Sequence, residues 1–484
     1  MKEIFNSYVK SRFIPISITI IFTIFILILL LNRFWQYEAF YYDHGMMEST
    51  AYQISRFKLP LHDRGFGRVP IYIDHLYPSL QLVLAPFYWI SDSYETPIIV
   101  MSILIGLSVL IGYEIGLKLK INKYILYVLL FAYVTYIGFQ NALIFFVHDI
   151  TLQIPFLMLL FLAIVYNRIK LFYLLLIINL GFKESFSVTG LALGISLLLF
   201  YQKQWQKHAV MTILISVLYG LLASKLIIPY FQYISFGSWG HFGYTPDIKF
   251  DPLNNLLNFI DTLQKRETIL TSLTNFGFLP LFSPFSMILL IQDFAQRFVL
   301  VGANSPLRQG LNLHYNANLA VILFVGSIFA VSKLQNYKLY RKLIYIHASI
   351  ILIIAIIFHQ FIYHGPYGLL YNREFYKITQ NMTFMNDFVA KIPREGKLMI
   401  QNNLAVRFTH DDLYILSSEE YLDKVQPDVI ALDFRPGQNI NNYWPVTEEK
   451  MKNLSEKLLN DPLYKPLYKE DCRYIFVKNP VSED

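Results

Sequence analysis

The sequence has few charged residues and almost no cysteine. Of its 484 residues, 15% are charged and 55% are hydrophobic, and Cys472 is the one cysteine. A single cysteine excludes a disulfide framework within the chain. The apolar share exceeds what one soluble core needs, so the composition is that of a membrane protein.

Several catalytic and nucleotide-binding motifs are also missing. The chain has no P-loop, no G-x-G-x-x-G fingerprint, no H-E-x-x-H and no G-x-S-x-G elbow. Its formal net charge of +7 comes from short basic clusters between apolar segments rather than from one stripe. Such clusters indicate membrane topology and not a nucleic-acid surface, so we expect no nucleic acid among the partners.

Long apolar stretches are what the sequence does have. Segments 13–31 and 347–364 approach or exceed the roughly 18 to 20 residues that cross a ~30 Å hydrocarbon layer. The first is too long for the apolar part of a secretory signal, and no A-x-A-like cleavage site follows, so we expect an uncleaved anchor. Nine spans are predicted, at 13–33, 96–117, 124–140, 150–167, 171–183, 186–201, 209–231, 316–332 and 343–363.

Basic residues between these spans assign the loops to sides of the membrane. Five clusters fall on one side, the cytoplasmic one, if the spans alternate and region 276–313 enters and leaves by the same face. Within that region, Pro280 and Pro284 interrupt any helix. We expect either a re-entrant hairpin or a kinked span with a return span through 294–313. The clusters are Lys2, Lys10 and Arg12; Lys118, Lys120 and Lys123; Arg168 and Lys170; Lys203 and Lys207; and Lys333, Lys338, Arg341 and Lys342.

This topology places loop 34–95, loop 232–275 and the tail after about residue 364 outside the cytoplasm. In the tail we predict strands at 397–403, 427–434 and 473–479 and an amphipathic helix at 450–461. The predicted fold is mainly α: a polytopic transmembrane helical bundle, residues 1–370, followed by a small extracytoplasmic α/β domain, residues 371–484.

Two carboxylates follow the first span within an aromatic belt. Segment 34–50 (FWQYEAFYYDHGMMEST) contains Asp43 and Glu48. Residues five positions apart do not lie on the same face of an ideal helix, so we expect a turn between Asp43 and Glu48. The segment is either catalytic or a solvated interfacial loop. Segment 74–90 is too short and too interrupted to span, and it predicts an interfacial helix with Asp74 and His75 at its entrance.

Other ionisable residues flank later spans on the same outer side. Lys183 and Glu184 lie between two spans, where a charged pair is costly and is either functional or a snorkelling ion pair. His148 and Asp149 begin another span, and alone they are more typical of an interface cap. Before the span at 316–332 stand three further candidates: Arg308, which could hold a phosphate bidentately, His314 and Tyr315.

These segments resemble a bacterial family of predicted membrane proteins, the DUF2079 group. YYDHGMMESTAYQISRFKLP resembles the family's F-D-x-G-x-x-D-Q opening, with Glu48 where the family usually has Asp. HLYPSLQLVLAPFY is similar to its H-F-S-P…A-P-x-Y, His148 to its F-H-x-E, and GFKESFSVTGLALGI to its K-E-D segment, with Ser185 replacing Asp. GFLPLFSP, HYNA (314–317), NNLAVRFTHDD (402–412) and PDVIALD are similar to its later motifs.

That family is in turn similar to the GT-C glycosyltransferases, which take sugars from polyprenyl-phosphate donors. The resemblance implies an enzyme of the bacterial inner membrane, in contact with membrane lipids, that acts on a glycan, lipid or protein acceptor on the outer face of the membrane. Asp43 is the implied general base and Glu48 positions the acceptor or helps hold a cation. Lys183 and Arg308 would balance the charge of the donor phosphate, and Glu184, His314 and Tyr315 are further implied residues of the donor site. His75, His148 and His314 are implied hydrogen-bonding residues. Mg²⁺ or Mn²⁺ suits carboxylates and histidines, but two acids are too few to argue a metal site.

Two other classes of function stay open. A transporter or flippase of a lipid-linked substrate would show repeated halves and charges near the midplane, whereas here no repeat is evident and the charges gather at one face. A membrane-anchored binding protein would use its tail for recognition.

Overall fold

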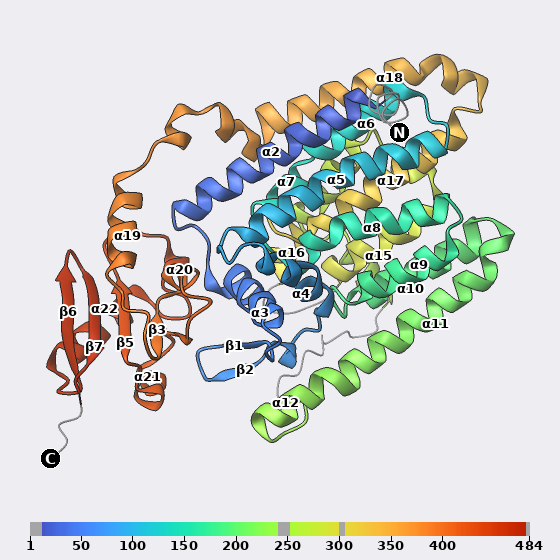
Figure 1. The fold of residues 1–484 in the computed structure, drawn as a ribbon. Helices are drawn as coiled ribbons and strands as arrows, with labels where there is room; N and C mark the ends of the chain where they lie inside the picture. The colour runs from blue at the N-terminus through green and yellow to red at the C-terminus, as the bar shows by residue number, and fades with distance from the viewer. Residues whose placement is uncertain (1–11, 241–251, 300–304, 481–484) are drawn as a thin grey trace. The chain divides into compact units, whose positions relative to one another are not determined.

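The structure is a computed structural model that describes residues 12–240, 252–299 and 305–480 (Figure 1). Lys2, Lys10 and parts of loop 232–275 and of region 276–313 lie outside these residues. The described chain is mainly helical with a small sheet near its C-terminus, as predicted. It divides into two compact units: unit 1, residues 1–29, 72–80 and 99–372, and unit 2, residues 30–71, 81–98 and 373–484.

The helices of unit 1 overlap all nine predicted spans. Span 124–140 is two helices, α6 and α7, bent by 48°, and span 209–231 is part of a longer rod, α11 to α12. The elements are α2 (Phe13–Trp35), α4 (Pro78–Leu84), α5 (Thr96–Lys118), α6 (Lys123–Thr135), α7 (Ile137–Leu143), α8 (Asp149–Val165), α9 (Ile169–Leu180), α10 (Phe186–Phe200), α11 (Gln206–Leu222), α12 (Ile228–Phe236), α13 (Pro252–Leu257), α14 (Leu263–Asn275), α15 (Pro284–Phe298), α16 (Ser305–Gln309), α17 (Asn316–Leu334) and α18 (Lys338–Ile357), of which α2, α4 and α5 cross a unit boundary.

Five helical segments among the described residues are long and apolar enough to cross a membrane, and six if the bent pair α6–α7 is one span. The five are Phe13–Trp35, Thr96–Lys118, Lys203–Phe236, Asn316–Leu334 and Lys338–Ile362. Helices α8, α9 and α10 are apolar but shorter, with 17, 12 and 15 residues.

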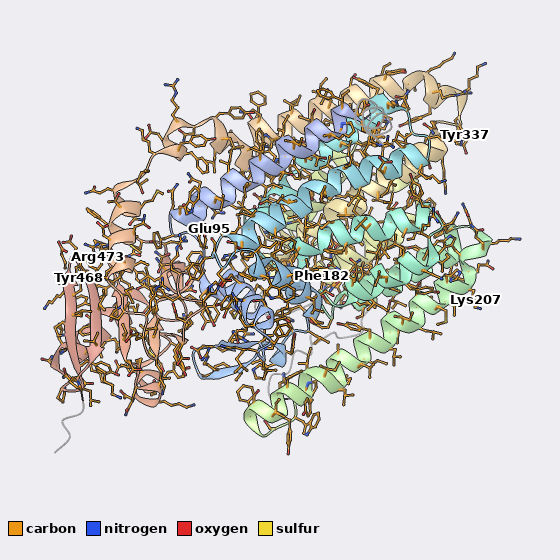
Figure 2. All side chains as sticks on the ribbon, viewed as in Figure 1. Glu95, Phe182, Lys207, Tyr337, Tyr468 and Arg473 are labelled. Carbon is orange, nitrogen blue, oxygen red and sulfur yellow. The ribbon has the colours of Figure 1, made fainter. Side chains whose placement is uncertain are left out.

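The described basic loops meet at one end of the helices of unit 1. Figure 2 labels two residues of this end, Lys207 in the first turn of α11 and Tyr337 just before α18. Three contacts join the loops: Lys118 Nζ lies 5.0 Å from the centroid of the Tyr166 ring, Gln335 Nε2 donates to the Lys120 carbonyl (2.9 Å), and Trp205 Nε1 donates to Asn167 Oδ1 (2.8 Å).

Helices α14 and α15 form a hairpin that enters and leaves at the same end. Lys265 Nζ, near the start of α14, donates to the carbonyl of Phe298 at the end of α15 (3.0 Å). The turn between them packs against the middle of α17, where a Cβ on Gly326 would lie 3.4 Å from Pro280. Pro284 occupies the start of α15, where proline removes no helical hydrogen bond. The hairpin differs from the predicted one, because its first arm is α14, which lies in the predicted outer loop 232–275 and not in region 276–313.

Unit 2 contains a five-stranded sheet in the order β4-β3-β5-β7-β6. Strands β4, β3 and β5 run parallel, with β4 at one edge of the sheet, and β7 pairs antiparallel with β5 and β6. The three predicted strands and the predicted helix are confirmed as β3, β5, β7 and α22, whereas β4 and β6 were not predicted. The elements are α19 (Gln380–Ala390), β3 (Leu398–Ile400), α20 (Asn402–Ala405), β4 (Leu413–Ile415), α21 (Glu419–Val425), β5 (Val429–Asp433), α22 (Glu448–Asn460), β6 (Tyr464–Glu470) and β7 (Arg473–Lys478).

Most of the loop after α2 folds with this sheet. It supplies α3 (Met46–Ser55) and an antiparallel hairpin of β1 (Leu61–Asp63) and β2 (Arg68–Pro70). Asp63 fixes the hairpin, because its carboxylate accepts hydrogen bonds from Ile415 N (2.5 Å) and the Tyr421 hydroxyl (2.6 Å). Burial raises the pKa of Asp63 against the effect of these hydrogen bonds. Segment 74–90, predicted as one interfacial helix, is α4 followed by a 3₁₀ turn.

Candidate functional site

A cluster of charged side chains lies where α8 begins and α9 ends. Asp149 is the first residue of α8, where free backbone N–H groups favour a carboxylate. Lys183 stands in the turn between α9 and α10, next to Phe182, which Figure 2 labels. Lys183 Nζ lies 3.0 Å from Asp149 Oδ2, and His148 Nδ1 contacts the other carboxylate oxygen, Oδ1. The Asp149 side chain is 1% exposed, so this is a buried pair.

The neighbouring residue Glu184 joins segment 72–80 to the same turn. Its carboxylate lies 2.9 Å from His75 Nδ1 and accepts a hydrogen bond from Leu76 N (2.9 Å). Gly181 permits the close approach, because a Cβ there would lie 2.3 Å from Ser79 Oγ. The short segment before α4 is therefore fixed to the turn between α9 and α10.

Lys183 and Glu184 stabilise each other's charge. Burial lowers the pKa of Lys183, but the carboxylates of Asp149 and Glu184 outweigh it and raise that pKa. Burial likewise raises the pKa of Glu184, but His75 and Lys183 outweigh it and lower that pKa. Both groups are therefore ionised at neutral pH.

Two histidines stack beside this pair. The rings of His148 and His314 lie 3.8 Å apart at 20°, and Tyr315 packs 4.2 Å from His314. Burial, followed by the charges of His148 and Lys183, lowers the pKa of His314 well below its usual value, so its ring is neutral. His314 Nδ1 is buried and has no hydrogen-bond partner in the described part of the chain.

Arg308 reaches the cluster from α16, and the α14–α15 hairpin holds its backbone. The guanidinium carbon of Arg308 lies 5.4 Å from the centroid of Tyr315. Arg297, in the last turn of α15, donates to the carbonyls of Arg308 (2.9 Å) and Gly310 (2.8 Å). Arg297 could not be recognised from the sequence, because a basic residue at a helix end is common on any surface.

Most of the outer residues predicted from the sequence therefore share one place in unit 1. The cluster lies at the N-terminal end of α17, where His314 and Tyr315 directly precede the helix. Lys333, one of the basic residues, lies at the C-terminal end of α17. At 1.5 Å per residue, the 19 residues of α17 separate the two ends by about 28 Å. The clustered residues are His75, His148, Asp149, Lys183, Glu184, Arg308, His314 and Tyr315, and Asp74 directly precedes His75.

Asp43 and Glu48 belong to unit 2, and the turn expected between them is present. Asp43 has φ 78° and ψ −88°, a conformation that costs a non-glycine residue about 1–3 kcal/mol and is frequent at functional sites. Its side chain is half-buried, and no hydrogen bond or ion pair to its carboxylate occurs among the described residues.

Glu48, in α3, has two partners that were not predicted from the sequence, Tyr88 and His410. Its Oε1 accepts hydrogen bonds from the Tyr88 hydroxyl (3.0 Å) and lies 2.6 Å from His410 Nε2. The His410 ring stacks on Tyr52 at 3.6 Å. Glu48 Oε2 is buried without a hydrogen-bond partner in the ranges described. His410 lies in the NNLAVRFTHDD segment, but no spacing in the sequence relates position 410 to position 48.

The described residues contain no group of three or more His, Cys, Asp or Glu side chains that could hold a metal ion.

The comparison with family models covers nearly the whole chain. Residues 35–472 match DUF2079, described as a predicted membrane protein. The chain belongs to the DUF2079 family. The matched residues run from the first acidic segment to β6 and include parts of both units. The two units of this DUF2079 protein are therefore both features of the family. No curated protein matches the chain.

Proposed function

We propose that this DUF2079 protein is a membrane glycosyltransferase that moves a sugar from a polyprenyl-phosphate donor to a glycan, lipid or protein acceptor on the outer face of the membrane. The observation that supports it best is the cluster in unit 1, where Lys183, Arg308 and three histidines meet at the ends of apolar helices. A lipid-linked phosphate needs this combination: apolar helices beside its chain, and cations beside its headgroup.

The cations would act on the leaving group. When the bond between the anomeric carbon and the phosphate oxygen breaks, the electron pair stays on the phosphate, and fixed positive charge there lowers the barrier. Lys183 is suited to this role because Asp149 and Glu184 keep it protonated and hold it in place. Arg308 offers a planar fork for two phosphate oxygens. The buried Nδ1 of His314 offers a further polar contact.

Asp43 would act on the acceptor. The acceptor hydroxyl oxygen forms the new bond to the anomeric carbon, and Asp43 takes its proton as general base. A carboxylate that lacks partners among the described residues and sits on strained backbone is available for such a transfer. Glu48 would support the segment through Tyr88 and His410.

A transporter or flippase of the same lipid-linked substrate is the second candidate. The bend of 48° between α6 and α7 and the returning hairpin α14–α15 favour it, because broken helices are typical of transporters. A transporter would bind the phosphate without breaking a bond, so it would not need a base at Asp43.

The test uses the full-length protein in lipid nanodiscs with a series of polyprenyl-phosphate-linked hexoses and a membrane glycolipid extract as acceptor. We expect release of polyprenyl phosphate with at least one donor. Asp43→Asn should lower that release by about 10²-fold or more, because the base is lost, while donor binding persists. Lys183→Gln should weaken donor binding.

Asp92→Asn is the matched control, since Asp92 is an exposed carboxylate of unit 2 outside the proposed site, and it should leave turnover unchanged. Full turnover in Asp43→Asn would refute the assigned base. Movement of an intact labelled donor across proteoliposomes, with no release of polyprenyl phosphate, would favour the transporter.

A further inference from the structure

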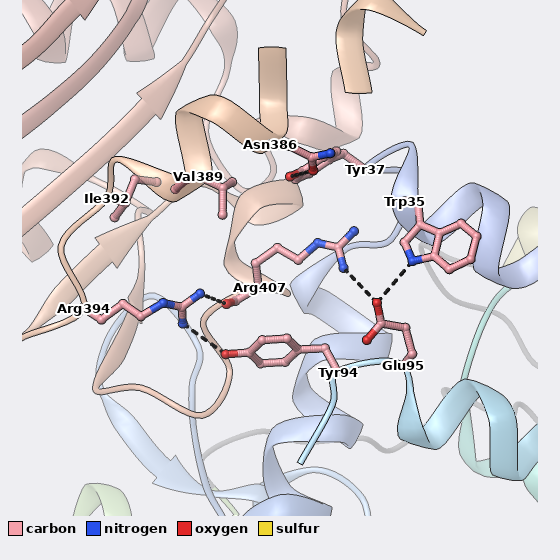
Figure 3. A pocket seen from close by; sticks show the side chains of 10 residues that line it. Trp35, Tyr37, Tyr94, Glu95, Asn386, Val389, Ile392, Arg394 and Arg407 are labelled. Carbon is pink, nitrogen blue, oxygen red and sulfur yellow. Dashed lines mark hydrogen bonds and ion pairs between the residues drawn. The ribbon is translucent and has the colours of Figure 1, made fainter. Parts of the chain in front are cut away.

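Unit 2 contains a pocket of about 430 Å³ (Figure 3). Small-molecule sites usually have about 300–1,000 Å³, so this pocket has room for a ligand of one or two sugar rings. Trp35, the last residue of α2, and Tyr37, just after the helix, line it, with Tyr94 and Glu95 from the segment before α5. Arg394 and Arg407 of the tail complete its polar wall, and all these residues belong to unit 2.

An indole ring is held open to solvent in this pocket. Trp35 is 44% exposed, although tryptophan is normally well buried. Its Nε1 donates to Glu95 Oε1 (3.1 Å), which fixes the ring. Such a ring presents an apolar face that can stack on the C–H groups of another molecule.

The polar groups of the pocket have fixed roles as donors and acceptors. The Tyr37 hydroxyl donates to Asn386 Oδ1 (2.8 Å), so the amide nitrogen of Asn386 is left as a donor. Arg394 donates to the Tyr94 hydroxyl (3.1 Å). Glu95 is an acceptor, because hydrogen bonds from Ser93 and Trp35 lower its pKa despite its burial.

The charges of the pocket are already balanced. Arg394 Nη1 lies 2.6 Å from Asp411, and Arg407 Nη1 lies 4.0 Å from Glu95. Arg407 is also packed 3.6 Å from the centroid of Phe34. An anionic ligand would meet the ionised Glu95, whereas a hydroxyl group both donates and accepts and so suits this mixture of polar groups.

We infer that this pocket binds an uncharged saccharide of one or two rings. The exposed face of Trp35 stacks on a sugar ring, and Glu95, Asn386 and the two arginines hydrogen-bond its hydroxyls. The inference stands on contacts within unit 2 and does not need the proposed transfer. If that transfer also holds, the saccharide is part of the acceptor.

The test measures saturation-transfer difference NMR on the full-length protein in nanodiscs prepared without sugar-based detergent. The ligands are maltose, cellobiose and chitobiose, with inorganic phosphate as competitor. At least one disaccharide should bind saturably and resist phosphate. Trp35→Ala should weaken binding about 10-fold, Trp35→Phe much less, and Glu95→Gln severalfold.

Trp89→Ala is the matched control. Trp89 belongs to unit 2, is 58% exposed and is likewise anchored through Nε1, to the carbonyl of Ser55 (2.8 Å), but it does not line the pocket. Absence of saturable binding, displacement by phosphate, or equal effects of Trp35→Ala and Trp89→Ala would each overturn the inference.

Different results would reject the proposed sugar transfer and the proposed saccharide pocket. Asp43→Asn should bind the disaccharide as the wild type does. Saccharide binding without any release of polyprenyl phosphate would reject the transferase alone. Release of polyprenyl phosphate without saccharide binding would reject the pocket alone.

Discussion

At the residue scale, Glu184 connects the charge of the cluster to the stability of unit 1. The pKa of Glu184 is lowered below its ordinary value of 4.5 in the folded protein. A carboxylate with a depressed folded pKa contributes stability above its unfolded pKa, and this contribution is lost as the pH falls through the folded pKa. The wild type should therefore lose stability below pH 4.5 in part through Glu184.

Replacing Glu184 with Gln should change both the level and the pH dependence of stability. At pH 7 the variant should be less stable by about 3 kcal/mol, because Lys183 and His75 lose a buried partner. Below pH 4.5 its melting temperature should fall less steeply than that of the wild type. Thermal unfolding in nanodiscs between pH 3 and pH 7 measures both effects. Glu267→Gln, at an exposed carboxyl of unit 1, serves as the control, and parallel curves for Glu184→Gln and the wild type would contradict the linkage.

The candidate residues of unit 1 could be predicted one by one but not as pairs. Lys183, Asp149 and Arg308 stand out because charges beside apolar segments are costly. Their distances depend on how the helices pack, which no local pattern encodes. His410 and Arg297 were missed because a histidine in a polar tail and an arginine at a helix end are ordinary residues until a partner is known.

At the element scale, the α14–α15 hairpin determines where Arg308 lies. Its turn reaches α17 at Gly326, where an added Cβ would lie 2.7 Å from Ser286 Oγ and 2.8 Å from Ser286 Cβ. Gly326→Ala should cost about 1–3 kcal/mol, because this contact has no room for a methyl group. A displaced hairpin also withdraws Arg297 from the Arg308 carbonyl, so binding of polyprenyl phosphate should weaken.

Melting temperature and polyprenyl-phosphate binding in nanodiscs measure the two effects of Gly326→Ala. Gly368→Ala is the control, because a Cβ at Gly368 would meet no atom within 4 Å. Equal melting temperatures for the two variants would show that the contact at Gly326 tolerates a methyl group. Lower stability with unchanged binding would separate the hairpin from Arg308.

The apolar helices were predictable, whereas polar or very short elements were not. Runs of Leu, Ile and Phe mark spans regardless of what surrounds them. Helix α14 (LQKRETILTSLTN) was assigned to an outer loop, because its buried face is mostly polar, with Thr268, Thr271 and Ser272 beside one aliphatic residue, Leu273. Strand β4 has three residues, and β6 (YKPLYKE) has mostly exposed side chains, so neither shows a clear period of two.

At the scale of the whole molecule, the arrangement of unit 1 predicts how the chain is oriented. Its basic loops meet at one end, and the cluster around Lys183 lies at the other end of α17. Since Lys and Arg concentrate in the cytoplasm, the cluster should face away from it. A tail that follows α18 should then be outside as well.

The lone cysteine makes this orientation measurable, because Cys472 is exposed and needs no engineered label. In spheroplasts of a bacterial host, a membrane-impermeant maleimide should label the wild type without permeabilisation. The double variant Cys472→Ser, Lys207→Cys carries its thiol among the basic loops and should be labelled only after permeabilisation. The opposite pattern would place the basic loops outside and the tail in the cytoplasm. The cluster would then face the cytoplasm, and the proposed transfer on the outer face of the membrane would be refuted.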